Sequence, residues 1–288
     1  MTDENFRHCQ LCKSKRSDHI KSFETYALVR CKECGFVFMN KTPSDNALNI
    51  YYSGYPRNHI NSLTLKNYSL LLNSFNKYRQ TNNILDVGCG AGCFLQVARK
   101  KGWNVYGTEF TDEAIAVCRK KGINAFKGEL GKINFKSNYF DVITSFEVLE
   151  HVTKPIKEIK LIRELLRDGG AAYITTPNYN SLSRLLLGDK WNIITYPEHL
   201  NYFTNKTIKK SFRQHGFSVL SLKTTGISIS RLQLSKKSGL KNTSAPTTDD
   251  ILRNSIYKYS LMRYLKNLIN MLLSLTHKGD TIKILCKK

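Results

Sequence analysis

The segment ILDVGCGAGCFL, residues 84–95, decides the fold. Its apolar run ends near Asp86, and three glycines follow at alternate positions: Gly88, Gly90 and Gly92. Glycines between a strand and a helix let the backbone turn sharply and approach a ligand, while the helix start presents unpaired amides. The dinucleotide fingerprint GxGxxG requires Gly or Ala where this chain has Cys93. The pattern is GxGxG, and the Asp86 carboxylate favours a cationic ligand over a pyrophosphate.

Short apolar runs alternate with amphipathic stretches around this segment. Strands are predicted near 83–87, 103–108, 140–145, 171–176 and 217–226. Helices are predicted near 92–101, 111–121, 154–167 and 205–215. The alternation is typical of an α/β fold with a doubly wound, mostly parallel sheet and helices on both faces. We expect residues 281–286 to form a closing strand at the edge of that sheet.

An acidic residue, Glu109, closes the second predicted strand, where a carboxylate can accept hydrogen bonds from both hydroxyls of a ribose. With this feature the chain resembles the class I S-adenosylmethionine-dependent methyltransferases. The resemblance is carried by ILDVGCGAGCFL, by YGTEFTDEA (106–114) and by FDVITSFEVLEHV (140–152). It spans about residues 81–288 and implies a Rossmann-like fold with S-adenosylmethionine as the cofactor.

The same resemblance implies roles for individual residues. Asp86 and the three glycines are expected around the methionine part of the cofactor. Glu109 is expected on the ribose, Glu129 and Phe146 are expected near the adenine, and Phe110 is expected to bind the cofactor as well. Because a fold alone does not give a function, a nucleotide-binding or inactive protein is the alternative.

Four of the eight cysteines form two CxxC pairs, Cys9 with Cys12 and Cys31 with Cys34, separated by 18 residues. This is the spacing of a four-thiolate zinc site, and Gly35 suits a tight turn there. Four protein ligands leave no position for substrate, so we expect the zinc to be structural. The alternative is a set of unrelated reduced thiols. The cysteine usage, with no secretory signal, predicts a cytoplasmic protein.

The segment WNIITYPEHLNYFT, residues 191–204, is expected at the carboxyl edge of the sheet, where ligands bind in such folds. Histidine suits proton removal because its pKa is near neutral, and an adjacent carboxylate can orient it. The predicted catalytic residues are therefore His199, Glu198 and Tyr196. The alternative is that His199 only braces a loop, and His151 is a second candidate for the base.

The whole layout resembles the zinc-ribbon methyltransferases of bacterial surface-polysaccharide and deoxysugar pathways. It divides the chain into a zinc ribbon (1–40), a helical connector (41–80) and a methyltransferase domain (81–288). In related sugar C-methyltransferases a Tyr-x-Glu-His element carries the base. Because this chain lacks their additional C-terminal domain, O-methylation of a sugar or sugar nucleotide is expected at least as much as C-methylation.

The chain has 45 basic residues (Lys and Arg) and 22 acidic residues (Asp and Glu). After residue 200 there are 17 basic residues and 3 acidic ones. A positive face near the acceptor site would attract a phosphorylated or nucleotide-linked sugar. Nucleic acid is the competing partner, which would make this an RNA-directed methyltransferase. A non-catalytic zinc-containing adaptor is a further alternative.

Residues 251–275 have the pattern of a basic amphipathic helix. Leucines recur along one face: Leu261, Leu265, Leu268, Leu272 and Leu275. Such a helix can lie on an anionic membrane, which would place the protein peripherally at the inner membrane face and favour a lipid acceptor. The preferred interpretation is that the stripe covers the sheet before the final strand.

Overall fold

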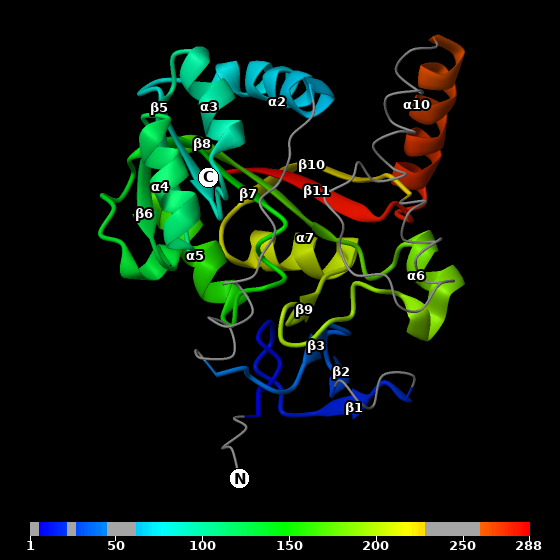
Figure 1. Cartoon of the computed structure of the whole chain (residues 1–288). Coiled ribbons are helices and arrows are strands. Elements are labelled where there is room, and N and C mark those ends of the chain that lie inside the picture. The colour runs from blue at the N-terminus through cyan, green and yellow to red at the C-terminus, as the bar shows by residue number, and fades with distance from the viewer. Residues whose placement is uncertain (1–5, 22–26, 45–61, 228–259) are drawn as a thin grey trace.

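A computed structural model describes residues 6–21, 27–44, 62–227 and 260–288 (Figure 1). Two sheets organise the described residues: one has seven strands, and the other has four. The larger sheet carries the glycine segment, and the smaller one joins the N-terminal cysteine region to the segment that contains His199.

The larger sheet confirms the predicted Rossmann-like, mostly parallel arrangement. Across the sheet the strands are β10 (Ser218–Thr225), β11 (Thr281–Lys287), β8 (Leu166–Pro177), β7 (Phe140–Phe146), β4 (Asn83–Val87), β5 (Asn104–Glu109) and β6 (Asn124–Lys127). Strands β8, β7, β4, β5 and β6 are mutually parallel. The carboxyl ends of β4, β5 and β7 therefore meet at one edge, as a ligand site in this fold requires.

The expectation of an edge strand at 281–286 is wrong. Strand β11 lies between β8 and β10 and pairs antiparallel with both. Its side chains alternate, and Ile282, Ile284 and Cys286 are fully buried on one face. On this side the edge strand is β10, an element earlier in the chain, and on the other side it is β6. Strand β6 was not predicted, because among its residues only Ala125 is buried and the local pattern carries almost no apolar signal.

Helices cover both faces of this sheet (Figure 1). Their bounds are α2 (Ser62–Phe75), α3 (Cys93–Lys100), α4 (Asp112–Lys120), α5 (Pro155–Leu165) and α7 (Asn205–Gln214). Helices α2, α3 and α4 share one buried cluster with Ile84 and Val105, whereas α5 and α7 share another with Leu85 and Ile143. The sequence explains where two of these helices begin. Pro155 is the first residue of α5, and the Thr204 side chain caps the N-terminus of α7.

The smaller sheet has the order β1 (Ser17–His19), β2 (Leu28–Cys31), β3 (Val37–Met39) and β9 (Asn201–Tyr202). Strand β9 belongs to the PEHLNYFT segment and pairs antiparallel with β3, with Val37 opposite Tyr202. The Phe36 ring packs on Phe203 with centroids 5.0 Å apart. Strand β2, which ends at Cys31, and the segment around His199 thus belong to one sheet, which appears below α7 in Figure 1.

The remaining elements are α6 (Leu182–Leu187), α10 (Ser260–Leu275) and the short 3-10 helices η2 (Asn76–Tyr78), η3 (Leu130–Lys132) and η4 (Gly188–Lys190). The leucine stripe does not cover the sheet as expected: Leu265, Leu268, Leu272 and Leu275 are exposed. Leu273 of α10 is buried, and its carbonyl accepts a hydrogen bond from Thr224 on β10. Residues 251–259 lie outside the described residues.

Among the residues that the structure describes, none of the helices combines the length and the apolar character needed to cross a membrane.

Candidate active site and metal centre

The glycine loop between β4 and α3 contains one glycine that borders open space. All three glycines have positive φ angles, +70° for Gly88, +52° for Gly90 and +72° for Gly92. A Cβ on Gly88 would lie 2.4 Å from Val148 Cγ2, and one on Gly92 would lie 2.5 Å from Ile123 Cδ1. Apart from Gly90 and its two neighbours in the chain, no heavy atom of the described residues lies within 4 Å of a Cβ placed on Gly90. Gly88 and Gly92 therefore serve packing, and Gly90 is where a ligand can approach the backbone.

Asp86 is almost completely buried where β4 approaches this loop. Its Oδ1 accepts a hydrogen bond of 2.7 Å from Thr144 Oγ1 on β7. Burial, opposed by that hydrogen bond, raises the pKa of Asp86 to about 8. The carboxyl group is therefore largely neutral at pH 7, and a cation placed beside it would favour ionisation.

Glu109 ends β5 and connects the glycine loop to the start of α4. Its Oε2 accepts a hydrogen bond from the Gly90 N–H at 2.9 Å. Its Oε1 accepts from the N–H groups of Phe110 and Thr111, at 2.7 and 3.2 Å. A carboxylate offers about four acceptor positions, so a ribose hydroxyl can share this group with the backbone.

Aromatic rings form one wall near Asp86. The Phe146 ring lies 5.0 Å from Phe94 and 5.9 Å from Tyr68, measured between centroids. Burial and then the nearby Asp86 raise the pKa of Tyr68 to about 12. Tyr68 comes from α2 and is not among the site residues predicted from the sequence. Its place in an apolar helical stripe resembles ordinary packing, so no local signal distinguishes it.

Phe110 and Glu129, the other two residues expected at the cofactor, lie after the carboxyl end of β5 and just before η3. Phe110 is 42% exposed and lies two residues before α4. Glu129 is exposed just before η3, and its charge helps to raise the pKa of Glu158, which burial raises most, to about 7. The preceding Gly128 donates its N–H to the Glu109 carbonyl at 2.9 Å, which ties this loop to the end of β5.

Together these groups fit S-adenosylmethionine by their chemistry. The carboxyl of Asp86 suits a ligand with cationic groups, and the carboxylate of Glu109 suits a diol. Gly90 allows close approach of the ligand to the backbone. The assignment of each residue to a part of the cofactor stays a prediction.

His151 and His199 lie in contact at the place where the methyl acceptor is expected, which we call the acceptor end. The rings of His151 and His199 have centroids 4.7 Å apart. His151 Nδ1 lies 2.9 Å from the Glu198 carbonyl oxygen, and His199 Nδ1 lies 2.6 Å from that of Ile193. A carbonyl only accepts, so each Nδ1 carries a hydrogen, and in the neutral form of such a ring Nε2 carries the lone pair. Burial lowers the pKa of His151, which keeps its ring neutral at pH 7.

Carboxylates flank this pair. The Oε1 of Glu198 lies 4.0 Å from His199 Nε2, and its Oε2 accepts a hydrogen bond from Thr195 Oγ1 at 3.2 Å. Glu150 is buried, accepts from Thr176 Oγ1 at 2.9 Å and places Oε1 3.8 Å from His151 Nε2. Glu150 is not among the site residues predicted from the sequence. Tyr196 is 37% exposed, so of the three predicted catalytic residues it is the one at the surface.

The ligand atoms of Glu150, His151 and His199 all lie within 4.8 Å of one another. Two imidazoles and a carboxylate are ligand types that divalent transition metals accept. The backbone carbonyls at each Nδ1 orient the rings in the way that outer partners of metal-bound histidines do. This trio is thus the second group of described residues, besides the cysteines, that could hold a metal ion.

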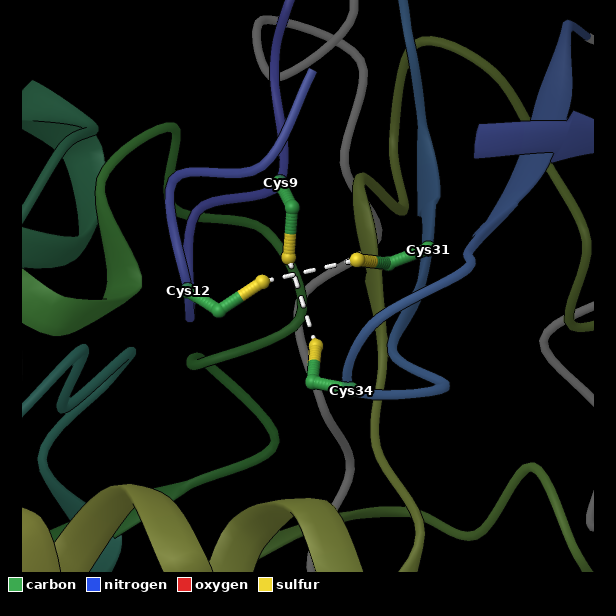
Figure 2. A group of neighbouring side chains, drawn as sticks. All are labelled: Cys9, Cys12, Cys31 and Cys34. Atoms are coloured by element: carbon green, nitrogen blue, oxygen red, sulfur yellow. Dashed lines mark hydrogen bonds between the residues drawn. The ribbon is translucent and has the colours of Figure 1, made fainter. Parts of the chain in front are cut away.

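The four N-terminal cysteines converge, as Figure 2 shows. The Sγ atoms of Cys9 and Cys34 are 3.5 Å apart, and those of Cys12 and Cys31 are 3.4 Å apart. Tetrahedral zinc, with Zn–S bonds of about 2.3 Å, holds sulfurs about 3.8 Å apart, so small shifts would accommodate the ion. The donor set therefore fits zinc.

Two similar turns bring these sulfurs together. The Lys13 N–H donates to the Cys9 carbonyl, and the Gly35 N–H donates to the Cys31 carbonyl. Lys13 and Gly35 both have positive φ, +62° and +71°. Although burial alone would raise the pKa of Cys31, backbone N–H donors in its turn lower it to about 7. The backbone donors of this turn therefore stabilise the Cys31 thiolate, the form that binds a metal, whereas burial raises the pKa of Cys34 to about 11.

Curated proteins similar to this chain include ubiquinone biosynthesis O-methyltransferases. The protein from Nitrosomonas europaea is 27% identical over 187 residues, which are 60% of this chain and 75% of that protein. The protein from Nitrosospira multiformis is 30% identical over 116 residues, 36% of this chain and 46% of its own. The chain spans about half the length of most of these relatives.

Solved structures share the fold. An S-adenosylmethionine-dependent methyltransferase from Archaeoglobus fulgidus superposes with a TM-score of 0.52 and 19% identity, over 78% of this chain and 94% of its own. The cyclase SpnF superposes with a TM-score of 0.55 and 15% identity, over 86% of this chain and 97% of its own. At these identities the likeness establishes the fold and leaves the reaction to the site.

A family model described as a methyltransferase domain matches residues 53–222, more than half of the chain. The matched range contains the glycine loop, Glu109 and both histidines of the acceptor end. The chain belongs to this methyltransferase domain family.

Proposed function

We propose that this methyltransferase moves the methyl group of S-adenosylmethionine to a hydroxyl group of a small polar acceptor, a sugar or sugar nucleotide of a cell-surface glycan pathway. The observation that carries the proposal is the His151–His199 pair beside the glycine loop. Val148, three residues before His151, packs against Gly88, which places the turn with His151 next to the loop.

The chemistry of methyl transfer explains what this pair can contribute. Bound S-adenosylmethionine supplies an activated methyl group on a sulfonium, so positioning of the acceptor provides much of the rate. A hydroxyl acceptor must also lose a proton. In the neutral ring, His199 Nε2 carries the lone pair because Nδ1 is held by the Ile193 carbonyl, so neutral His199 can take that proton. Glu198, 4.0 Å away, would stabilise the resulting imidazolium.

The polar surroundings of the pair support a hydroxyl-rich acceptor. Glu150 and Glu198 lie beside the histidines, and carboxylates accept hydrogen bonds from hydroxyl groups. The excess of Lys and Arg after residue 200 favours a phosphorylated form of the acceptor, because it raises the local concentration of anions.

A phenolic or quinol acceptor is the second candidate. Two observations favour it: the similar curated proteins are named as ubiquinone biosynthesis O-methyltransferases, and α10 exposes Leu265, Leu272 and Leu275. Exposed leucines on a basic chain also suit contact with an anionic membrane surface, which a lipid-linked acceptor would require.

To test the proposal, the protein is given methyl-labelled S-adenosylmethionine together with separate fractions from cells that lack this protein. The measurement is which fraction takes up the label. Label in the sugar-nucleotide fraction would support the proposal and provide material for locating the methylated atom. Label confined to the lipid fraction would favour the phenolic acceptor, and label confined to RNA would show that the basic surface recognises nucleic acid. If titration calorimetry detected no binding of S-adenosylmethionine, the proposal would fail and the non-catalytic adaptor would be favoured.

We further propose that the four cysteines hold one structural zinc ion in a ribbon at 1–40, followed by a connector at 41–80 and a catalytic domain at 81–288. A cytoplasmic location would place this enzyme with nucleotide-linked sugars. The closed set of four thiolates supports a structural role for zinc, because it leaves no position for the acceptor.

A further inference from the structure

Arg7 is a buried arginine that joins three separate segments. It precedes the zinc ligand Cys9 by two residues, and its side chain is buried. One guanidinium nitrogen donates to the carbonyl oxygens of Met39 and Leu200, at 3.3 and 3.2 Å. The other donates to the Thr153 carbonyl at 2.9 Å and to Asn201 Oδ1 at 3.1 Å. These acceptors lie at the end of β3, around β9 and just after His151.

Asn201 extends this connection to the backbone around His151. Its Nδ2 donates to the carbonyls of Leu149 and Val152, at 3.1 and 2.7 Å. The N–H of Asn201 donates to the Glu150 carbonyl at 3.0 Å. Arg7 binds Oδ1 of the same amide and so fixes which way the amide faces. The turn that carries His151 is thereby held against the segment that carries His199.

We infer that the cysteine-bearing sheet is a working part of the acceptor site: Arg7 is a positioning residue that, through Asn201, sets the separation of His151 from His199. The inference rests on the proposed function for the role of the histidine pair. The fork of an arginine is suited to this because it donates several directed hydrogen bonds at once, and a buried guanidinium requires all of them.

These contacts distinguish the acceptor end from the cofactor end. The hydrogen bonds to Asp86 and Glu109 come from β7, the glycine loop and the start of α4. None of those donors is a partner of Arg7 or Asn201 in the described chain. Loss of the Arg7 contacts should therefore alter the histidine pair and leave S-adenosylmethionine binding in place.

The test compares Arg7→Met and Arg7→Lys with a control in the same sheet, Arg16→Met, whose side chain is exposed and pairs with Glu33. For Arg7→Met we expect kcat to fall at least about tenfold, with bound zinc and the Kd for S-adenosylmethionine close to those of the wild type. Arg7→Lys keeps one cationic donor and should recover part of the rate. Arg16→Met should match the wild type.

Histidine NMR provides a readout that does not depend on turnover. The side-chain resonances and pKa values of His151 and His199 should shift in Arg7→Met and stay unchanged in Arg16→Met. Unchanged histidine resonances in a folded Arg7→Met protein would overturn the inference. If the histidines shift but no acceptor is ever methylated, the proposed function fails and the positioning role stands.

Asn201→Asp keeps the test decisive if Arg7→Met does not fold. The aspartate retains an oxygen for Arg7 but loses the Nδ2 donors to Leu149 and Val152. We expect retained zinc, retained cofactor affinity and shifted histidine resonances. Histidine spectra and kcat equal to those of the wild type would show that the connection through Asn201 does not position the pair.

Discussion

The rings of His151 and His199 are 4.7 Å apart and tilted by 56°, although they belong to turns on opposite sides of β8 in the chain. The contact is reinforced through the backbone, because the carbonyl of Glu198 accepts from His151 Nδ1. The residue next to one histidine thus fixes the tautomer of the other. The backbone carbonyls at the two Nδ1 atoms therefore orient both rings.

Replacing His199 by Ala should lower kcat by about 10²-fold to 10⁴-fold, the usual contribution of a general base. The Kd for S-adenosylmethionine should stay within about twofold, because the cofactor groups are held by other contacts. Steady-state kinetics with calorimetry would measure both quantities. His19→Ala, at an exposed position of β1, is the control. Equal activity in the two variants would assign His199 to bracing of its loop.

Asp86 should make cofactor binding depend on pH. In the free protein its pKa is about 8, so its carboxyl is largely protonated at neutral pH. A cationic ligand favours the carboxylate, so binding should release a proton. Affinity should then rise with pH by up to about tenfold per unit and level off above about pH 8.

Calorimetry in two buffers of different ionisation enthalpy would measure this proton release. Because S-adenosylmethionine has an amino group of its own, the decisive quantity is the difference between wild type and Asp86→Asn. Asp112→Asn, which removes an exposed carboxylate paired with Lys127, is the control. Identical pH profiles for wild type and Asp86→Asn would contradict the role given to the buried carboxyl.

The parts of the fold that sequence reasoning reaches are those encoded by neighbouring residues. The apolar run before Gly88 predicts β4, and the CxxC spacing predicts the convergence of sulfurs around Cys31. Strand β11 was misplaced because its alternating pattern shows a half-buried strand and cannot show which strands flank it. The position in a sheet is a long-range property.

The acceptor end shows the same limit. The cluster of Glu198 and His199 is visible in the sequence, but their contact with His151 arises only when two turns are brought together by β9 and Arg7. In the sequence, Tyr68 is one member of an apolar helical stripe. The residues around it do not predict that α2 packs against the ring of Phe146. Both contacts, of His199 with His151 and of Tyr68 with Phe146, depend on packing between distant segments. The spacing of neighbouring residues does not predict them.

Removal of Cys31 and Cys34 by double substitution to Ser should abolish stoichiometric zinc and lower the free energy of unfolding by several kcal/mol, because metal binding is coupled to folding. Metal analysis and thermal unfolding would measure both. Cys93→Ser, a partly buried thiol outside the cluster, is the control and should keep its zinc. Full zinc content in the double variant would rule out the four-thiolate site.

Asp141 should control acid stability by holding the strand that leads to the glycine loop. Its Oδ2 accepts N–H groups of Gln80, Thr81 and Asn82, each at 2.8 Å, just before β4. Its Oδ1 accepts from Arg167 at the start of β8. Burial acts to raise the pKa of Asp141, but these donors outweigh it and hold the pKa below the ordinary 3.8.

The sign follows from that lowered pKa. The ionised carboxylate stabilises the folded state above the ordinary pKa, and this stability is lost as pH falls through the lower folded value. Asp141→Asn should lower the free energy of unfolding by about 2–4 kcal/mol at neutral pH, because a neutral amide oxygen replaces an acceptor of several donors. The variant should also lose less stability than wild type between about pH 5 and pH 2.

Urea unfolding across this pH range would measure the effect. The control is Asp168→Asn, whose carboxylate pairs with Lys288 but is 93% exposed, so its removal should change stability by less than about 1 kcal/mol. A similar loss in both variants would mean that the backbone contacts of Asp141 contribute little. A larger loss in Asp141→Asn alone, fading as pH falls, would show that a buried carboxylate fixes the entry of β4 and with it the position of the glycine loop.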